Sequence, residues 1–373
     1  MTTTKNNEHK KLNFSSEREQ SQACLNTAEH EKNQGRKVLN VPNLRFPEFE
    51  GEWETYKIQD VLRIGNGRDY KHLGTGDIPV FGTGGYMTSV TDYLYDGETT
   101  FIGRKGTINK PYYYKGKFWT VDTLFYTHSF NGVTPHFVYC LFQTINWLRY
   151  NEASGVPSLS KDTIEKIKLH IPQIEEQQKI SKLLSLLDER ITTQNKIIDK
   201  LQSLIKGIAH KVSKQGKPNT RLSECLQCAS STLQESDVAE VGLYPVYGAN
   251  GIVGYLDTYN TTSEAIYIIK DGSGVGTVSY VNGKCSATGT LNILQTNDGF
   301  SLRYLYFMLK VFGFEPYKTG MAIPHIYFKD YGKAKIYCPN YELQNKCANL
   351  LYEIEQKATI EQKILDNLNS ATL

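Results

Sequence analysis

The sequence predicts an α+β protein with two mostly β globular domains, each followed by a long helix. We expect the two helices to pair as an antiparallel coiled coil with pseudo-two-fold symmetry. Three observations support this fold class. Segments of the first half recur at a nearly constant offset in the second half. Short runs rich in Val, Ile, Tyr, Phe and Thr alternate with glycine turns, and apolar residues at heptad spacing follow each such region.

The first 41 residues are polar and lack helical or strand periodicity, which predicts a disordered tail. No apolar run approaches the ~20 residues that cross a bilayer, and no signal peptide is visible. Seven scattered cysteines, an odd number, favour reduced thiols over a disulfide framework. We therefore expect a cytoplasmic protein without a membrane partner.

Net charge alone does not indicate a nucleic-acid partner, because 42 basic residues face 39 acidic ones. Any such argument must rest on where the charges lie. The pair Cys225 and Cys228 lacks the two further ligands of a structural zinc site. Alignment of the repeats places these cysteines against Val61 and Ile64, so we interpret them as core residues.

The internal repeat divides the chain. The matching segments are 78–82 with 244–248, 115–117 with 282–284, 168–172 with 335–339, and 194–201 with 361–368. A nearly constant offset over four segments is hard to obtain by chance. The resulting boundaries are globular domain 42–172, helix 173–212, linker 213–220, globular domain 221–339 and helix 340–373. Within the globular domains, 136–150 and 302–312 are predicted to be helical.

The heptad seam is the clearest structural signal. In the first helix it runs through Ile180, Leu184, Leu187, Ile191, Ile198, Leu201, Ile205, Ile208 and Val212, and in the second through Cys347, Leu351, Ile354, Ala358, Leu365 and Leu368. One polar residue interrupts each seam at equivalent positions, Gln194 and Glu361. Either these two meet and fix the helix register, or both face water. At ~1.5 Å per residue, the first helix would be ~60 Å long, a spacer on the scale of one to two DNA turns.

A basic loop follows the predicted strand 99–102. Glycines let backbone N–H groups approach phosphate, and arginine can read guanine edges. The segment runs to a predicted turn at 115–117. It is interpreted as a DNA contact, the alternative being a solvated hairpin tip. The candidate residues are Gly103, Arg104, Lys105, Gly106, Thr107, Lys110, Lys115 and Lys117.

The matching loop of the second repeat is rich in glycine. A dinucleotide or adenosylmethionine cradle would need a helix after the glycines, whereas strand-forming residues 277–281 and an Asn-Gly turn follow. The loop is therefore a second candidate DNA contact, through Lys270, Ser273, Gly274, Thr277 and Lys284.

A small-residue loop closes each globular domain, at 154–162 and 319–330. It either presents polar groups to DNA or serves as a structural connection, and both interpretations stay open. Its candidates are Ser158, Ser160, Lys161 and His325. No Walker, zinc-protease or nucleophile-elbow motif occurs, so no catalytic site, cofactor site or metal site is predicted in this chain.

The duplicated order of globular domain and Pro-led heptad helix resembles the specificity subunit of type I restriction-modification systems. The resemblance covers about residues 42–373. It is carried by the opening segment 44–53, the Pro-Val-aromatic-Gly segments at 79–82 and 245–248, and Ile171-Pro172 with Glu175-Glu176-Gln177. Glu342-Leu343-Gln344 matches Glu176-Gln177 less well, which makes docking at the second helix less secure.

This resemblance implies two target recognition domains that read different halves of a split, double-stranded DNA site. It implies helices that act as spacer and dock for methyltransferase subunits, with two copies expected, and restriction subunits that join the complex. Adenosylmethionine, ATP and Mg²⁺ would belong to those partners. The alternatives are a self-contained methyltransferase or nuclease, and a stand-alone DNA-binding or scaffold repeat protein.

Overall fold

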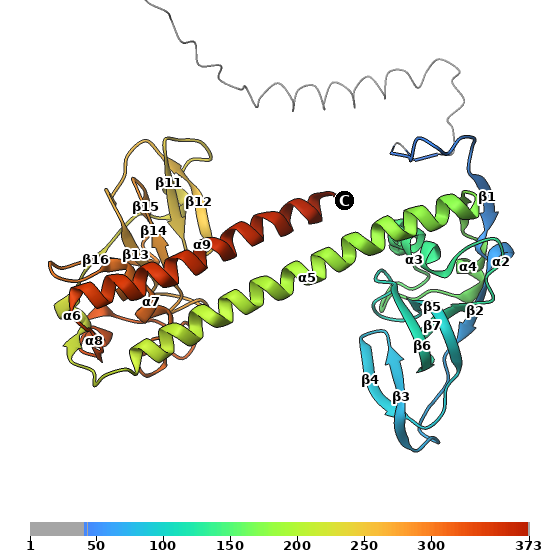
Figure 1. Cartoon of the computed structure of the whole chain (residues 1–373), viewed down its shortest axis with the longest axis horizontal. Coiled ribbons are helices and arrows are strands. Elements are labelled where there is room, and N and C mark those ends of the chain that lie inside the picture. Colours follow the sequence, from blue (N-terminus) through green and yellow to red (C-terminus); the bar gives the residue numbers. More distant parts are fainter. Residues whose placement is uncertain (1–40, 43, 372–373) are drawn as a thin grey trace, which may run out of the picture. The chain divides into compact units, whose positions relative to one another are not determined.

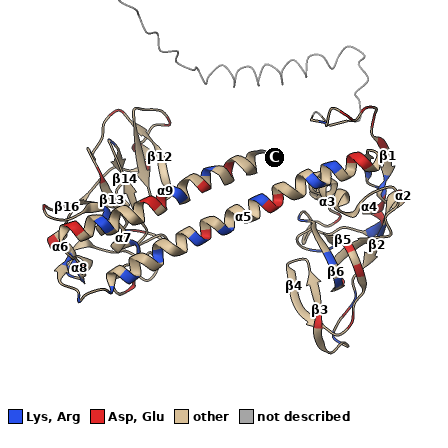
Figure 2. Cartoon of the chain, in the orientation of Figure 1, with Lys and Arg blue, Asp and Glu red and all other residues tan. Residues whose placement is uncertain are grey.

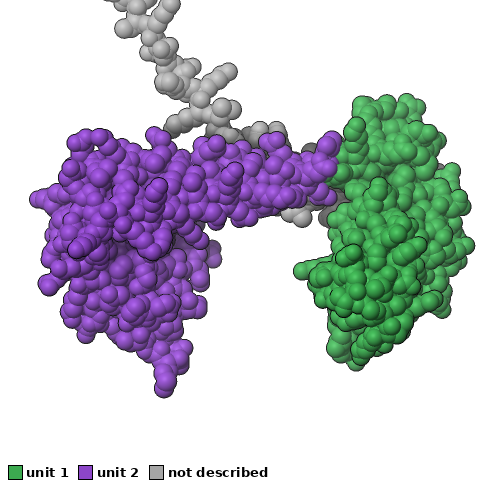
Figure 3. All heavy atoms as spheres, turned by 60° about the horizontal axis from the view of Figure 1, so that its bottom comes forward, with its two compact units in different colours: residues 1–185 green, residues 186–373 purple. Residues whose placement is uncertain are grey.

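The computed structural model describes residues 41, 42 and 44–371. The predicted disordered tail lies outside the described residues, apart from Val41. The chain forms two compact units, residues 1–185 and 186–373 (Figure 3). Each contains mixed strands and helices, so the predicted α+β class is confirmed.

Unit 1 is built around a six-stranded sheet with the order β2-β7-β5-β6-β3-β4 (Figure 1). Its strands are β2 (Arg63–Asn66), β3 (Thr75–Gly82), β4 (Gly85–Val90), β5 (Tyr95–Gly103), β6 (Tyr112–Thr120) and β7 (Leu124–His128). The pairs are antiparallel except β3 with β6, which are parallel. Near the end of β3, Val80 and Gly82 are buried and Phe81 between them is less so, which fits the two-residue period of a strand with one covered face.

A second layer of unit 1 joins the sheet to the long helix. It holds β1 (Glu54–Lys57), α2 (Ile58–Val61), α3 (Pro135–Thr144), the 3-10 helix η2 (Trp147–Tyr150), α4 (Lys161–Lys166) and β8 (Lys168–Ile171). Strands β1 and β8 pair antiparallel. The predicted helix at 136–150 therefore forms as α3 with a short 3-10 extension. Its apolar face, with Phe137, Val138 and Phe142, is buried in the main core of the unit.

Unit 2 repeats this plan with shorter strands. Its elements are β9 (Thr220–Arg221), α6 (Leu222–Cys225), β10 (Leu226–Ser230), η3 (Glu235–Asp237), β11 (Tyr244–Gly248), β12 (Gly251–Leu256), β13 (Ala265–Ile269), β14 (Val278–Val281), β15 (Ser286–Ala287), β16 (Leu291–Thr296), α7 (Leu302–Lys310), η4 (Glu315–Tyr317), α8 (Phe328–Tyr331) and β17 (Lys335–Ile336). They form sheets of order β10-β16-β13-β14 and β12-β11-β15, and a β17-β9 pair.

The register of unit 2 reproduces that of unit 1. Val80 pairs in parallel with Trp119, and Val246, which holds the equivalent position of the second repeat, pairs in parallel with Ser286. The predicted helix at 302–312 forms as α7, whose residues are almost all buried. The sequence repeat is therefore also a structural repeat.

The two cysteines near the start of unit 2 belong to its core. Cys225 is fully buried, and its equivalent Val61 is buried in the core of unit 1. Cys228 is half-buried and packs against the same cluster as Cys225. The interpretation of these thiols as core residues is confirmed.

The two predicted long helices form as α5 (Ile174–Ser213) and α9 (Tyr341–Ala371). Within unit 2, the residues of α5 after Ser185 run antiparallel to α9 (Figure 1). Ile205, Ala209 and Val212 share a buried cluster with Ala348 and Leu351. The apolar seam is the driving force for this contact, since its side chains leave water on packing.

Gln194 and Glu361 meet, as one of the two sequence hypotheses proposed. The Gln194 amide donates to the backbone carbonyl of Glu361 at 3.0 Å and also to its carboxylate. Gln194 is 2% exposed, so the alternative in which both residues face water is wrong. Whether this contact fixes the helix register remains a prediction.

A buried glutamine fastens each long helix to its globular domain. In unit 1, Gln177 accepts a hydrogen bond from Thr134 N at 2.9 Å and donates to the carbonyls of Gly132 and Pro172. In unit 2, Gln344 accepts from Ser301 N at 3.0 Å and donates to Pro339 O. These contacts satisfy backbone groups at the starts of α3 and α7, where a helix leaves them without partners of its own.

Candidate nucleic-acid interface

In unit 1, two loops that the sequence analysis predicted as separate candidate DNA contacts lie next to each other. The loop after β5 and the loop before α4 meet in a short antiparallel bridge between Lys105 and Ser158. Gly106 N donates to Pro157 O at 2.8 Å, and Leu159 N donates to Arg104 O at 2.9 Å. This local pairing holds the predicted residues 103–107 beside Ser158, so we call residues 103–107 and 156–159 the loop pair of unit 1.

Unit 2 builds the same loop pair. Asp271 bridges His325, Gly272 N donates to Pro324 O at 3.0 Å, and Ile326 N donates to Lys270 O at 2.9 Å. The predicted residues Lys270 and His325 therefore lie in one place. The loop pair of unit 2 consists of residues 270–276 and 323–326.

Two positions have the same chemistry in both loop pairs. Arg104 N donates to Thr123 O at 2.8 Å, and Lys270 N donates to Thr290 O at 3.0 Å, so the two cations occupy equivalent sites. Gly106 and Gly272 both have a positive φ, of 85° and 97°, which favours glycine strongly. Each unit therefore presents one cation next to a left-handed glycine turn.

Other glycines of these loops serve packing instead. A Cβ on Gly103 would lie 2.1 Å from the carbonyl oxygen of Thr107, so this glycine lets the loop fold back on itself. Gly276 N donates to Ile269 O and Thr277 N to Gly274 O, which closes the glycine-rich turn between β13 and β14. Thr107 in the loop pair of unit 1 and Ser273 in that of unit 2 are exposed to solvent, and so is Lys110, which follows the first loop.

The expected turn at 115–117 is wrong, because these residues lie inside strand β6. Lys115 pairs with Glu98 across the sheet at 2.8 Å, and this carboxylate raises the pKa of Lys115. Lys117 lies further from the loop along the same strand, its ammonium 4.9 Å from the Tyr93 ring centroid. Because a strand advances ~3.3 Å per residue, these two lysines are separate from the loop pair.

Lys284 repeats the arrangement of Lys117. Its ammonium is 4.9 Å from the Tyr259 ring centroid, and cation–π attraction accounts for this position. Ser160 is the N-cap of α4, because its hydroxyl accepts from Thr163 N at 3.1 Å. Lys161 pairs with Glu165 at 3.6 Å. The polar groups of these residues thus have structural partners within their own unit.

Two exposed apolar residues at the loop pairs were not predicted from the sequence. Val156 is 67% exposed and Ile323 is 58% exposed. Each directly precedes the proline whose carbonyl joins the two loops. In the sequence, these two residues hold equivalent positions of the repeat. This equivalence points to a shared exposed site only after the structure shows that each residue lies where two loops pair.

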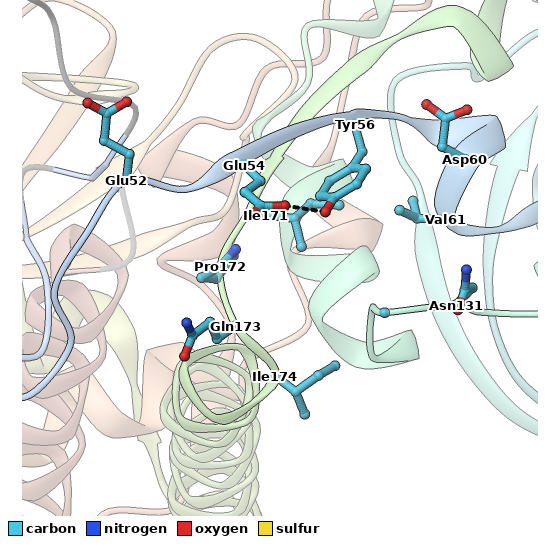
Figure 4. Close-up of a pocket in the computed structure, with 11 residues that line it drawn as sticks. Glu52, Glu54, Tyr56, Asp60, Val61, Asn131, Ile171, Pro172, Gln173 and Ile174 are labelled. Carbon is cyan, nitrogen blue, oxygen red and sulfur yellow. Dashed lines mark hydrogen bonds between the residues drawn. The ribbon is translucent and has the colours of Figure 1, made fainter.

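A pocket of about 330 Å³ in unit 1 lies next to the start of α5 (Figure 4). Its polar lining is acidic, with Glu52, Glu54 and Asp60, and Tyr56 donates a hydrogen bond to Glu54. Negative charge repels phosphate, so this pocket is no candidate for DNA contact. Within the described part of the chain, no three or more His, Cys, Asp and Glu side chains are grouped to hold a metal ion.

Charge along the long helices is mixed, with basic and acidic residues interspersed on α5 and α9 (Figure 2). Such a mixture attracts phosphate less than a basic cluster does, so the loop pairs are the better candidates for DNA contact. Among the described residues, no helix combines the length and hydropathy that crossing a membrane requires.

Comparison with known proteins identifies the family. The family model described as "Type I restriction modification DNA specificity domain" matches residues 50–203 and again 221–370. The chain belongs to this family, with two copies of its domain. This agrees with the family that the sequence resembles.

Similar proteins carry the corresponding names. The chain is 24% identical over 156 residues to the "Type I restriction enzyme EcoprrI specificity subunit" of Escherichia coli, covering 39% of this chain and 38% of that protein. It is 26% identical over 220 residues to the "Putative type I specificity subunit S.MgeORF438P" of Mycoplasma genitalium, covering 52% of this chain and 56% of that one. The alignments thus span about two fifths to little more than half of these relatives.

A solved structure has the same fold. The crystal structure of the "Type-I restriction-modification system S subunit from M. genitalium" superposes with a TM-score of 0.71 at 17% identity. The match covers 90% of this chain and 97% of that one. At this identity the similarity establishes the fold of the chain.

Proposed function

We propose that this chain is the DNA-sequence-recognition subunit of a type I restriction-modification complex and carries no catalytic site itself. The globular domains 42–172 and 221–339 each read one half of a bipartite, asymmetric site in double-stranded DNA. The observation that carries the proposal is the loop pair, which is built twice on one scaffold with different side chains at its tip. Two equivalent loop pairs with different side chains are expected to recognise a DNA site whose two halves differ in sequence.

The loop pairs supply both kinds of contact that DNA recognition needs. Arg104 and Lys270 can neutralise phosphate or donate to base edges, and the glycine turns beside them allow close approach of the backbone. Both cations are partly exposed. Binding through such contacts weakens as salt rises, because counterions compete for the phosphates.

The long helices act as spacer and dock. On α5, Leu186, Ile197 and Leu204 lie on one face and are 54%, 37% and 47% exposed. On α9, Leu350 and Ile360 are 50% and 58% exposed. The three residues of α5 form a stripe that a partner helix can cover. We assign this face to methyltransferase subunits, two per complex, with restriction and translocase subunits joining them.

Adenosylmethionine, ATP and Mg²⁺ then belong to those partners, and this chain holds no cofactor. The complex works in the cytoplasm, where its DNA is found. Two rival functions make different predictions. A self-contained methyltransferase would bind adenosylmethionine as an isolated chain, and a scaffold protein would show no salt-dependent affinity for DNA.

The test is purification of the tagged full chain from its own cells, with partners identified by mass spectrometry. We expect a methyltransferase subunit in about twofold molar excess over the chain. The chain purifying alone or as a homodimer, without a methyltransferase, would refute the proposal and favour the scaffold alternative. A tagged but unrelated DNA-binding protein from the same cells controls for DNA-mediated recovery.

A further inference from the structure

The bridged residues at the centre of the two loop pairs differ in chemistry, while the backbone hydrogen bonds around them are equivalent. The bridged residues are Lys105 with Ser158 in unit 1 and Asp271 with His325 in unit 2. Backbone hydrogen bonds on both sides of each bridge are equivalent, as described above. The neighbouring cation and the glycine turn are retained. If the two domains recognise different DNA sequences, the difference should come from side chains that change while the backbone around them stays the same.

The chemistry at this position is opposite in the two units. In unit 1, Lys105 is an exposed ammonium, which only donates hydrogen bonds. In unit 2, Asp271 is a carboxylate held by His325, with 2.6 Å between His325 Nδ1 and Asp271 Oδ1. The Asp271 and His325 side chains are 34% and 35% exposed, so the pair is accessible.

The histidine gives the carboxylate a fixed orientation. A hydrogen bond to Oδ1 restrains the side-chain rotation of Asp271 and leaves Oδ2 as its second acceptor. Among the described residues, no hydrogen bond to Oδ2 is formed. An oriented acceptor at the tip of a loop is a suitable reader of a base donor, since discrimination requires defined geometry and not charge alone.

We propose that these bridged pairs are specificity-determining residues, with Lys105 selecting guanine in one half-site and Asp271, positioned by His325, selecting cytosine in the other. The inference rests on the proposed function in DNA recognition. In the major groove, guanine presents the acceptors O6 and N7, and cytosine presents the N4 amino donor. Lysine matches the first pattern and aspartate matches the second. Both units have a cation beside this position, Arg104 or Lys270, so the presence of a cation does not distinguish the two half-sites.

The experiment transfers the chemistry of one unit to the other. The tagged full chain, with the subunits that co-purify, selects duplexes from a randomised library, and the bound DNA is sequenced. In the double variant Asp271→Lys/His325→Ser, we expect one position of the second half-site to change from cytosine to guanine, by about tenfold. The first half-site stays unchanged.

Two further variants separate misfolding from loss of reading. Asp271→Asn is nearly isosteric and should lose the preference for cytosine at the same position, with a gain for adenine, because asparagine matches the adenine edge. Asp298→Asn removes the same charge from an exposed turn of unit 2 and should change neither half-site. Lys105→Ala should relax one position of the first half-site alone.

The outcomes are distinguishable. If the Asp271 variants select the same two half-sites as the unchanged chain, the inference is overturned and the proposed function stands. If the unchanged chain selects no sequence at all, the proposed function fails and the inference fails with it. A shift confined to one position of one half-site supports both.

Discussion

Gln177 provides a test of how the first globular domain is fastened to its helix. Gln177→Ala removes three hydrogen bonds and leaves Thr134 N and the carbonyls of Gly132 and Pro172 without this partner. The side chain is fully buried. Leaving buried polar groups unsatisfied costs roughly 1–3 kcal/mol each where water cannot replace the partner. We expect a loss of about 3 kcal/mol in the free energy of unfolding of unit 1.

Tryptophan fluorescence measures this loss selectively. All three tryptophans of the chain, Trp53, Trp119 and Trp147, belong to unit 1. With a denaturant slope of about 2 kcal/mol per molar urea, the tryptophan-reported midpoint should fall by about 1.5 M. Gln344→Ala is the matched control, because it removes the equivalent contacts of unit 2. Equal midpoints for Gln177→Ala and the unchanged chain, or equal shifts for both variants, would refute the reasoning.

Three further predictions concern the helices and the loops. Arg45→Met should lower the same tryptophan-reported midpoint, because it removes the 2.7 Å ion pair with Glu176, whose side chain is 2% exposed. The double variant Arg45→Met/Glu176→Met should recover part of this loss, because no unpaired carboxylate then remains buried. Gln194→Leu should destabilise the α5–α9 contact by about 1–2 kcal/mol, because it removes the hydrogen bonds to Glu361. Cysteine cross-linking between the two helices should then detect a second helix register. A single, unchanged register would show that Gln194 does not fix the register. In binding assays, Arg104→Ala should lower affinity for the first half-site about tenfold and leave the sequence preference at the second half-site intact. An equal loss of affinity on every DNA sequence would instead make Arg104 a phosphate contact.

The sequence predicted the elements whose signals are local or periodic. Heptad spacing located α5 and α9, and the constant offset located the duplication, because both patterns are repeated many times along the chain. The contact between Gln194 and Glu361 was one of the two interpretations that the same pattern allowed, and only the structure distinguishes them.

Long-range partners were beyond this reasoning. The sequence marks Gln177 and Gln344 only as parts of a docking motif, whereas the structure buries both against loops much earlier in the chain. Lys115 and its glycine neighbour have turn composition, yet strand pairing with Glu98 decides their conformation. The two halves of each loop pair lie far apart in the sequence, so only the folded chain shows that they form one candidate site.

The central claim is that the two domains of this chain read the two halves of one DNA site. Single-molecule sequencing of methylated bases in the source cells, with and without the gene for this chain, tests it most directly. We predict that deletion abolishes methylation at one asymmetric motif with two specified halves and an unspecified spacer. An unchanged set of methylated motifs after deletion would contradict the claim.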